Sequence, residues 1–312
     1  MAFTAQDVKA LREKTGVGMM ECKKALVESD GDMEKAIDFL RERGLAAAAK
    51  KATRIAAEGV VLPYYDSAAK KGVVVEVNSE TDFVAKNEKF MNFVEGVAKT
   101  ILATDPADVE ALCAEKFDGT DETVTDVLNQ LVLSIGENMK IRRFERMDGI
   151  VSTYIHGGGA VGVMIGFDVA DEAVADSEAF VAMGKNVAMQ IAAMNPSYLD
   201  QASVPADVVE HEKGILAAQM KEDPKMASKP EAVLVKIAEG KMSKYYKENC
   251  LVEQEFVRGD LFQGSVKGYI DSVAKELGTT IKANGFIRMM KGDGLEKREE
   301  NFAEEIAKQI NG

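Results

Sequence analysis

The chain has 312 residues, of which 46% are hydrophobic and 29% are charged. These values are close to those of ordinary globular proteins, so they exclude a disordered, collagen-like or fibrous chain. At about 100 to 200 residues per domain, the length predicts two domains, or two domains and a small module. The net charge is −13, because 52 acidic residues outnumber 39 lysines and arginines. Since acidic proteins are repelled by phosphate backbones and anionic lipids, we do not expect direct binding to nucleic acid or membranes.

Neither the cysteines nor the histidines form a recognisable site. Cys22, Cys113 and Cys250 are odd in number, far apart and without C-x-x-C spacing, which favours a reducing compartment and buried apolar roles for the thiols. His156 and His211 have no second ligand at metal-binding spacing. No apolar run has the roughly 20 residues of a membrane span, and the first seven residues carry no signal or transit pattern. We therefore expect a cytoplasmic protein without a metal.

The first 54 residues read as a helical module that leads into a connector. Helical spacing and turn residues predict helices over 5–14, 20–28 and 33–43, with Gly44 as the C-terminal cap of the third. The alanine-rich segment 45–57 has strong helix propensity and predicts a helical connector. The module has 11 basic and 9 acidic residues, so it differs in charge from the acidic remainder.

An internal repeat at a constant offset of 90 residues follows the module. Segments 59–64 and 72–75 recur as 149–154 and 162–165. The register continues into an amphipathic pattern, in which matching apolar positions are Phe90 and Phe180, Val97 and Val187, and Ile101 and Ile191. Each copy therefore reads as a strand hairpin followed by a helix. We predict an α+β fold with two related subdomains, each with an antiparallel sheet that buries one face beneath helices.

The two subdomains are expected at 55–145 and 146–284, and a C-terminal strand and helix at 285–312. Within that last part, 286–289 read as the strand and 301–310 as the helix.

The second subdomain is interrupted by an inserted antiparallel helical hairpin over about 207–249. Its arms, 208–220 and 232–246, have helical spacing and are separated by a proline-containing turn at 223–230. Residues 251–257 then read as a strand that returns to the body.

Gly157, Gly159 and Gly162 satisfy the dinucleotide-binding spacing G-x-G-x-x-G. That motif has to open a helix whose N-terminus receives pyrophosphate, whereas here it leads into a strand-like segment, so we interpret it as a hairpin loop. His156 precedes this loop and is interpreted either as an exposed tip or as a contact with a partner. The chain has no G-x-S-x-G motif and no P-loop. Enzymatic chemistry is not indicated, and we predict no catalytic residues and no cofactor.

The two repeats differ just after their hairpins, where Asp82 and Phe83 are replaced by Glu172 and Ala173. An aromatic residue beside an acid at a strand-to-helix turn has two interpretations: a plug in the core, or a projecting hydrophobic wedge. Aromatic anchors are enriched among binding hot spots, and a neighbouring aspartate can accept hydrogen bonds that orient the contact. From the residues alone, both interpretations stay open.

Two motifs resemble the signatures of the elongation factor Ts family, the guanine-nucleotide exchange factors of the GTPase elongation factor Tu. One is Thr-Asp-Phe-Val-Ala at 81–85, and the other spans 11–26, within what the resemblance makes a ubiquitin-associated-like module. Further similarity runs through 135–143 and ends near 285–288, so it covers nearly the whole chain. The resemblance implies the same architecture as the helical spacing and the internal repeat: a helical module, two related subdomains and a helical hairpin.

The resemblance also implies contact residues for elongation factor Tu. The module is expected to pack on the partner's nucleotide-binding domain through Arg12, Met19, Met20 and Lys23. The signature residues Asp82 and Phe83, flanked by Thr81 and Val84, match a dipeptide whose ring wedges between helices of that domain and disturbs its magnesium and phosphate site. Further contacts are implied for Ile135, Gly136 and His156.

The implied function is non-enzymatic nucleotide exchange. The factor would bind elongation factor Tu in its GDP-bound and nucleotide-free states, promote GDP release and allow GTP to bind. Dimerisation of the complex stays open. The alternative is a non-catalytic adaptor whose N-terminal module binds ubiquitin-like proteins or nascent chains. That alternative predicts binding by residues 1–54 alone and no dependence on Phe83.

Overall fold

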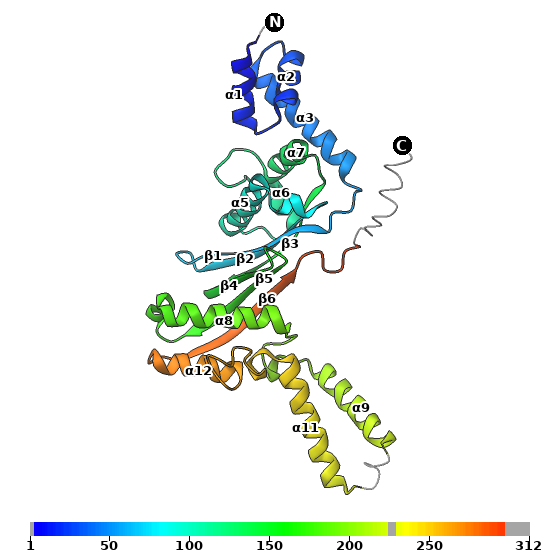
Figure 1. Ribbon diagram of the computed structural model, residues 1–312, viewed down its shortest axis with the longest axis vertical. Coiled ribbons are helices and arrows are strands. Elements are labelled where there is room, and N and C mark those ends of the chain that lie inside the picture. Colours follow the sequence, from blue (N-terminus) through cyan, green and yellow to red (C-terminus); the bar gives the residue numbers. More distant parts are fainter. Residues whose placement is uncertain (1–2, 224–228, 297–312) are drawn as a thin grey trace.

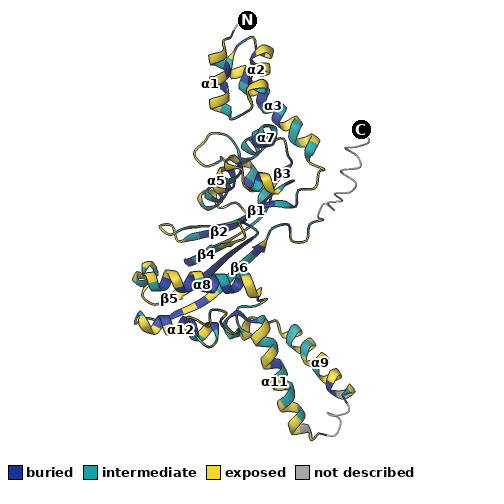
Figure 2. Ribbon diagram, viewed as in Figure 1, coloured by how far each residue is buried: buried dark blue, intermediate teal, exposed yellow. Residues whose placement is uncertain are grey.

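The computed structural model describes residues 3–223 and 229–296. A helical module lies at one end of an elongated molecule, two sheets with helices on their outer faces form the body, and a helical hairpin projects at the opposite end (Figure 1). The central strands are largely buried, whereas the hairpin is mostly exposed or half-buried (Figure 2). The expected α+β class is confirmed.

The N-terminal module contains α1 (Ala5–Thr15), α2 (Met19–Glu28) and the long α3 (Met33–Lys51). Thr4 and Asp7 form a reciprocal capping box at the start of α1, which satisfies amide groups that a helix end leaves unpaired. The three helices close around a small apolar core. Its fully buried members include Leu11, Cys22, Leu26 and Leu40.

The prediction that Gly44 caps the third helix is wrong, because α3 continues through Gly44 to Lys51. Gly44 is buried where α3 crosses α7 (Val124–Ile135), and a Cβ at this position would lie 3.2 Å from the carbonyl oxygen of Asn129. Gly44 is therefore a packing glycine that lets two helices approach closely. The helical connector is confirmed as far as Lys51.

Each half of the body has a three-stranded antiparallel sheet. The first has the order β1-β2-β3 and the second β4-β5-β6. The strands of the first sheet are β1 (Glu58–Asp66), β2 (Lys71–Ser79) and β3 (Met139–Asp148), and those of the second are β4 (Ile150–His156), β5 (Val161–Val169) and β6 (Ile281–Met290). Both central strands have a register shift, between Glu76 and Val77 and between Gly166 and Phe167, so even this irregularity recurs at the 90-residue offset.

The helix that follows each hairpin also repeats at that offset. α5 (Glu88–Thr104) and α8 (Glu178–Met194) have corresponding bounds, and both end at a residue with left-handed backbone. Two shorter helices, α6 (Val109–Ala114) and α12 (Val266–Glu276), and α7 complete the outer layers. The predicted unit of a hairpin and a helix is therefore confirmed in both copies, and the glycine-rich segment at 157–160 is the hairpin turn.

The sheet faces that lack helices pack against each other (Figure 1). The contact is apolar. Its buried members are Val61, Val74, Val151, Met164 and Met289, with Met147, Tyr65 and Ile287 at its edge. A Cβ on Gly72 would lie 2.5 Å from Met164 Sδ, so the two sheets approach closely at that point.

The predicted hairpin is formed by α9 (Ala206–Glu222) and α11 (Glu231–Asn249). The predicted strand at 251–257 is wrong: this segment starts with a 3-10 helix, Leu251–Glu253, and continues as irregular chain. Leu251 and Phe256 are buried in the core of the second half, and Phe256 N donates to Gly264 O at 2.8 Å. The strand expected at 286–289 is confirmed within β6, while the helix expected at 301–310 lies outside the described residues.

Candidate partner-binding site

The segment 81–84 forms a tight turn between β2 and α5. The four-residue helix α4 (Asp82–Ala85) begins three residues after β2 ends. Val84 is 5% exposed and lies in the core of the first half, whereas the Phe83 side chain is 80% exposed. Val84 therefore anchors the turn from inside while Phe83 projects into solvent. The core-plug interpretation of Phe83 is excluded.

The backbone of this turn is bonded to the turn between α7 and β3. Thr81 N and Thr81 Oγ1 donate to the two carboxylate oxygens of Glu137, at 3.0 and 2.8 Å. In the opposite direction, Asn138 N donates to Glu80 Oε1 at 2.5 Å. Arg54 also approaches Glu80, with its Nη1 3.4 Å from Oε1. The two residues that precede Asp82 and Phe83 are therefore both bonded to distant segments of the first half.

Asp82 forms an ion pair with Lys86 one helical turn later, at 2.9 Å. The hydrogen bond from Lys86 lowers the pKa of the Asp82 carboxyl below its ordinary value. The Asp82 side chain remains about half exposed. It is thus a charged acceptor that lies beside an exposed aromatic ring.

Ile135 and Gly136 lie at the C-terminus of α7. Ile135 is half-buried against the core of the first half, and Gly136 is exposed. Gly136 has φ 89° and donates its N–H to Val132 O at 2.9 Å, a left-handed helix end that favours glycine. The two residues directly precede Glu137, so the bond from Thr81 brings them close to α4 in the fold.

The four candidate residues of the module, Arg12, Met19, Met20 and Lys23, are all exposed. Met19 is 43% and Met20 75% exposed. Two exposed methionines on the same module as exposed cations are suited to protein contact, because the flexible thioether side chain adapts to varied surfaces.

The α1–α2 loop is attached to the body close to the other two segments. The carbonyl oxygen of Gly16 accepts from Lys89 Nζ at 2.6 Å and from Ser134 Oγ at 3.2 Å. Lys89 lies in the first turn of α5, shortly after α4, and Ser134 directly precedes Ile135. The carbonyl group of Gly16 therefore connects the module to two segments of the first half, the start of α5 just after α4 and the end of α7.

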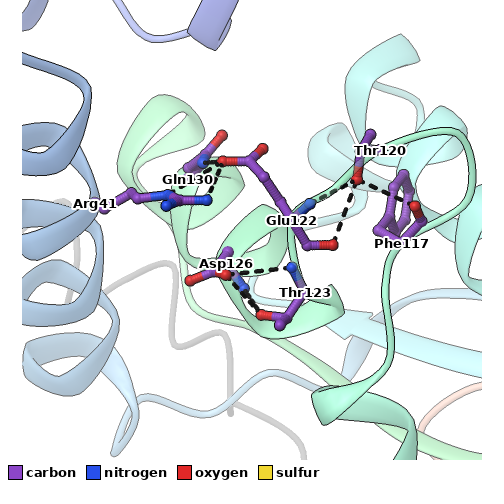
Figure 3. A network of polar contacts seen from close by, with 7 residues as sticks. All are labelled: Arg41, Phe117, Thr120, Glu122, Thr123, Asp126 and Gln130. Carbon is purple, nitrogen blue, oxygen red and sulfur yellow. Dashed lines mark hydrogen bonds and ion pairs between the residues drawn. The ribbon is translucent and has the colours of Figure 1, made fainter. Parts of the chain in front are cut away.

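A second set of polar contacts holds α3 on the body (Figure 3). Arg41 Nη2 from α3 lies 3.0 Å from Glu122 Oε1, and Gln130 Nε2 from α7 donates to the same oxygen at 2.7 Å. Leu133 of α7 packs into the apolar core of the module. Thr123 and Asp126 form the capping box that starts α7 beside these contacts (Figure 3). The orientation of the module is therefore defined by both polar and apolar contacts.

His156, the remaining candidate, ends β4 in the second sheet and is exposed. Tyr154 Oη lies 3.1 Å from His156 Nδ1. Among the described residues, the hydrogen bond and the ring contact of the His156 side chain are both with Tyr154 and not with α4, the end of α7 or the α1–α2 loop. The structure thus groups the other candidate segments and leaves His156 as a separate point on the second half.

Sequence reasoning missed the residues that hold these segments together. Glu80, Lys89, Glu122 and Ser134 make contacts between segments far apart in the chain, and no local spacing indicates them. Glu137 lies in a motif that carried the family resemblance, but its bond to Thr81 spans 56 residues.

No group of three or more histidine, cysteine, aspartate or glutamate side chains between residues 3 and 223 or 229 and 296 could hold a metal ion. Within the same ranges, no helix is both long and apolar enough to cross a membrane.

The first half has an exposed aromatic residue on a hydrogen-bonded turn, and the module attached to it has exposed methionines and cations. Such residues are typical of protein-binding surfaces. Comparison with known proteins defines the family. Residues 80–293 match the family model described as elongation factor TS. The elongation factor Ts of Clostridium kluyveri is 49% identical over 315 residues, covering 99% of both chains. That of Clostridium perfringens is 50% identical over 310 residues, covering 98% of both.

A third relative, the elongation factor Ts of Clostridium novyi, is 46% identical over 312 residues and 99% of both chains. The chain belongs to the elongation factor Ts family, and the resemblance noted in its motifs is confirmed. Its role is that of a translation elongation factor.

Proposed function

We propose that this elongation factor acts as the guanine-nucleotide exchange factor of elongation factor Tu. It binds the GDP-bound form, promotes release of GDP and remains on the nucleotide-free form until GTP binds. The observation that carries the proposal is the 80% exposure of Phe83 on a turn that is bonded to the rest of the first half. A large apolar side chain held in solvent is suited to fill a pocket on a partner.

The proposed mechanism is differential binding. Asp82 and Phe83 insert between helices of the partner's nucleotide-binding domain and favour a state in which its magnesium and phosphate site is disturbed. Because this state binds GDP weakly, linkage requires that GDP weaken the affinity for the factor by the same ratio. No covalent bond is made or broken, so the factor needs no catalytic residue of its own.

Several contacts are needed for the size of the effect. Shifting an equilibrium from 1:99 to 99:1 takes about 5.5 kcal/mol of preference for one state, more than one aromatic side chain commonly contributes. We propose that Arg12, Met19, Met20 and Lys23 supply contacts to the same partner domain. His156 supplies a contact from the second half to another domain of the partner.

The function is tested by release of fluorescent GDP from purified elongation factor Tu, with and without this protein. We expect wild-type protein to accelerate release and Phe83→Ala to lower the acceleration about thirtyfold, the size of a hot-spot loss of about 2 kcal/mol. The melting temperature should stay within about 2 °C of wild type, because removing an exposed side chain costs little stability.

Leu261→Ala is the matched control, since Leu261 is also an exposed large apolar side chain, at 51%, and lies in the second half. It should exchange at the wild-type rate. Full activity of Phe83→Ala would remove the wedge from the mechanism. No acceleration by the wild-type protein would reject exchange itself and turn attention to the adaptor alternative, which requires binding by residues 1–54 alone.

A further inference from the structure

Two turns of the first half are joined by reciprocal hydrogen bonds to each other's glutamate side chains. Glu137, in the turn after α7, accepts from the amide and the hydroxyl of Thr81. Glu80, in the turn before α4, accepts from the amide of Asn138. Each turn therefore supplies one acidic side chain and one backbone N–H to the other. The acids are half-buried, and Asn138 is 8% exposed.

These bonds replace the usual means of fixing the start of a helix. Thr81 is the N-cap residue of α4, yet its side chain makes no capping bond to α4; its hydroxyl donates to Glu137 instead. A helix of four residues is too short to be stable by itself. Hydrogen bonds to an ionised carboxylate are stronger than neutral ones, so Glu137 holds Thr81 by both its amide and its hydroxyl, in addition to the bond from Ser79 Oγ to Thr81 O at 2.9 Å.

The direction of α4 decides where Phe83 points. Phe83 is 80% exposed, so packing in this protein does little to orient its ring. Val84 anchors one side of the turn in the core, and the other side is anchored at Thr81 by Glu137. A turn that lost the second anchor would sample more orientations, and the apparent affinity for a partner falls with the fraction in the competent one.

We propose that Glu137 is a positioning residue for Phe83, which holds α4 in the orientation that engages the partner, and that the Glu80–Asn138 bond supports the same arrangement. The inference rests on the proposed function and adds to it. It also makes Ile135 and Gly136 part of the same rigid unit as Phe83, because they directly precede the acid that binds Thr81.

The test compares two substitutions of Glu137 in the assay of fluorescent GDP release from elongation factor Tu. Glu137→Ala removes both acceptors, and we expect exchange to slow about tenfold, in line with the loss of hydrogen bonds to a charged group. Glu137→Gln keeps an oxygen for Thr81 N–H and gains an N–H that can donate to Thr81 Oγ1, so its rate should stay within about twofold of wild type. Glu110→Ala, an exposed acid in α6, is the control for charge.

A double-mutant cycle separates positioning from general stability. If Glu137 acts through Phe83, adding Glu137→Ala to Phe83→Ala should produce no further slowing. Hydrogen exchange of the Thr81 amide should accelerate in Glu137→Ala, while amides in β2 stay protected. If Glu137→Ala folds poorly, Thr81→Val removes the hydroxyl bond alone and should slow exchange about threefold.

The positioning role is rejected if Glu137→Ala exchanges at the wild-type rate while Phe83→Ala is slow, or if the two losses multiply. These outcomes differ from a failure of the proposed function. In that case Phe83→Ala itself would be fully active, or the wild-type protein would not accelerate GDP release.

Discussion

Phe83 and Val84 are neighbours in the sequence and lie in opposite environments, one 80% and the other 5% exposed. Either apolar residue could have filled the core, so the sequence alone could not decide whether Phe83 is a core plug or a projecting wedge. The direction of the backbone after β2 decides between them, and that direction depends on Glu137, a residue 56 positions from Thr81. At this scale, the residue types of the site could be predicted, while the groups that orient them could not.

The reactivity of the three cysteines tests how deeply each thiol is buried. Burial raises the pKa of Cys250 to about 11, with further contributions from Glu253 and Asp200, and burial likewise raises the pKa of Cys22. A raised thiol pKa leaves less reactive thiolate. Cys113 is half-buried. At pH 8, we expect iodoacetamide to modify Cys113 well before the other two.

Mass spectrometry of peptides after timed alkylation measures the three rates separately. Cys113→Ser should remove the fast phase. Equal rates at all three cysteines in folded protein would contradict the burial of Cys22 and Cys250.

At the scale of elements, the 90-residue repeat predicted the hairpin and helix of both halves, because strands and amphipathic helices leave local periodic patterns. Gly44 shows where local patterns mislead: the residue looks like a helix end, but its contact is Asn129 in another helix. The segment 251–257 reads as a strand from its residue types, yet it forms a 3-10 helix and irregular chain that buries Leu251 and Phe256 in the core. Contacts between distant segments decided both positions.

A pair of glycine substitutions tests the crossing of α3 and α7. Gly44→Leu places a side chain where even a Cβ lies 3.2 Å from Asn129 O, so it should separate the helices and loosen the module. We expect a loss of about 2 kcal/mol in the free energy of unfolding and earlier cleavage by trypsin within the first 54 residues.

Gly214→Leu in α9 is the matched control, because nothing lies within 4 Å of a Cβ there. Leucine is the better helix former, so this variant should be as stable as wild type or more stable by up to about 1 kcal/mol. Equal stability of the two variants would show that α3 and α7 need no close approach.

At the scale of the whole molecule, a buried acid ties the two halves together. Glu76 of β2 is fully buried and accepts from Arg142 at 3.0 Å, from Arg143 at 2.7 Å and from Asn78 at 3.0 Å. It also accepts from the amide of Gly292, just beyond β6, at 2.7 Å. The chain that leaves the second sheet is therefore fastened to the central strand of the first.

This cluster predicts a pH-dependent effect of Glu76→Gln. Burial alone would raise the pKa of Glu76, but the bonds from Gly292, Asn78, Arg143 and Arg142 together lower it below its ordinary value. A lowered pKa stabilises the fold above the unfolded-state pKa, and that stabilisation is lost as the pH falls through the folded-state value. At pH 7 we expect the variant to lose about 3 kcal/mol, because the arginines lose their buried partner.

Urea denaturation of wild type and variant between pH 7 and pH 3 measures the difference. The difference in the free energy of unfolding between wild type and variant should have its full value above about pH 5. It should become smaller in acid as Glu76 of the wild type becomes protonated. A difference in unfolding free energy that stays constant down to pH 3 would mean that the charge of Glu76 contributes nothing to stability. Glu110 is an exposed acid, so Glu110→Gln should unfold with the same free energy as wild type at every pH.

The apolar contact between the sheets uses matching positions of the two repeats. Val61 and Val151 correspond at the 90-residue offset, as do Val74 and Met164. Each half thus presents to the other a surface like the one it receives, which is the property of an isologous dimer interface. In this respect the body resembles a homodimer whose two subunits have been joined into one chain, and a single half produced alone would expose to solvent the surface of an unpaired subunit.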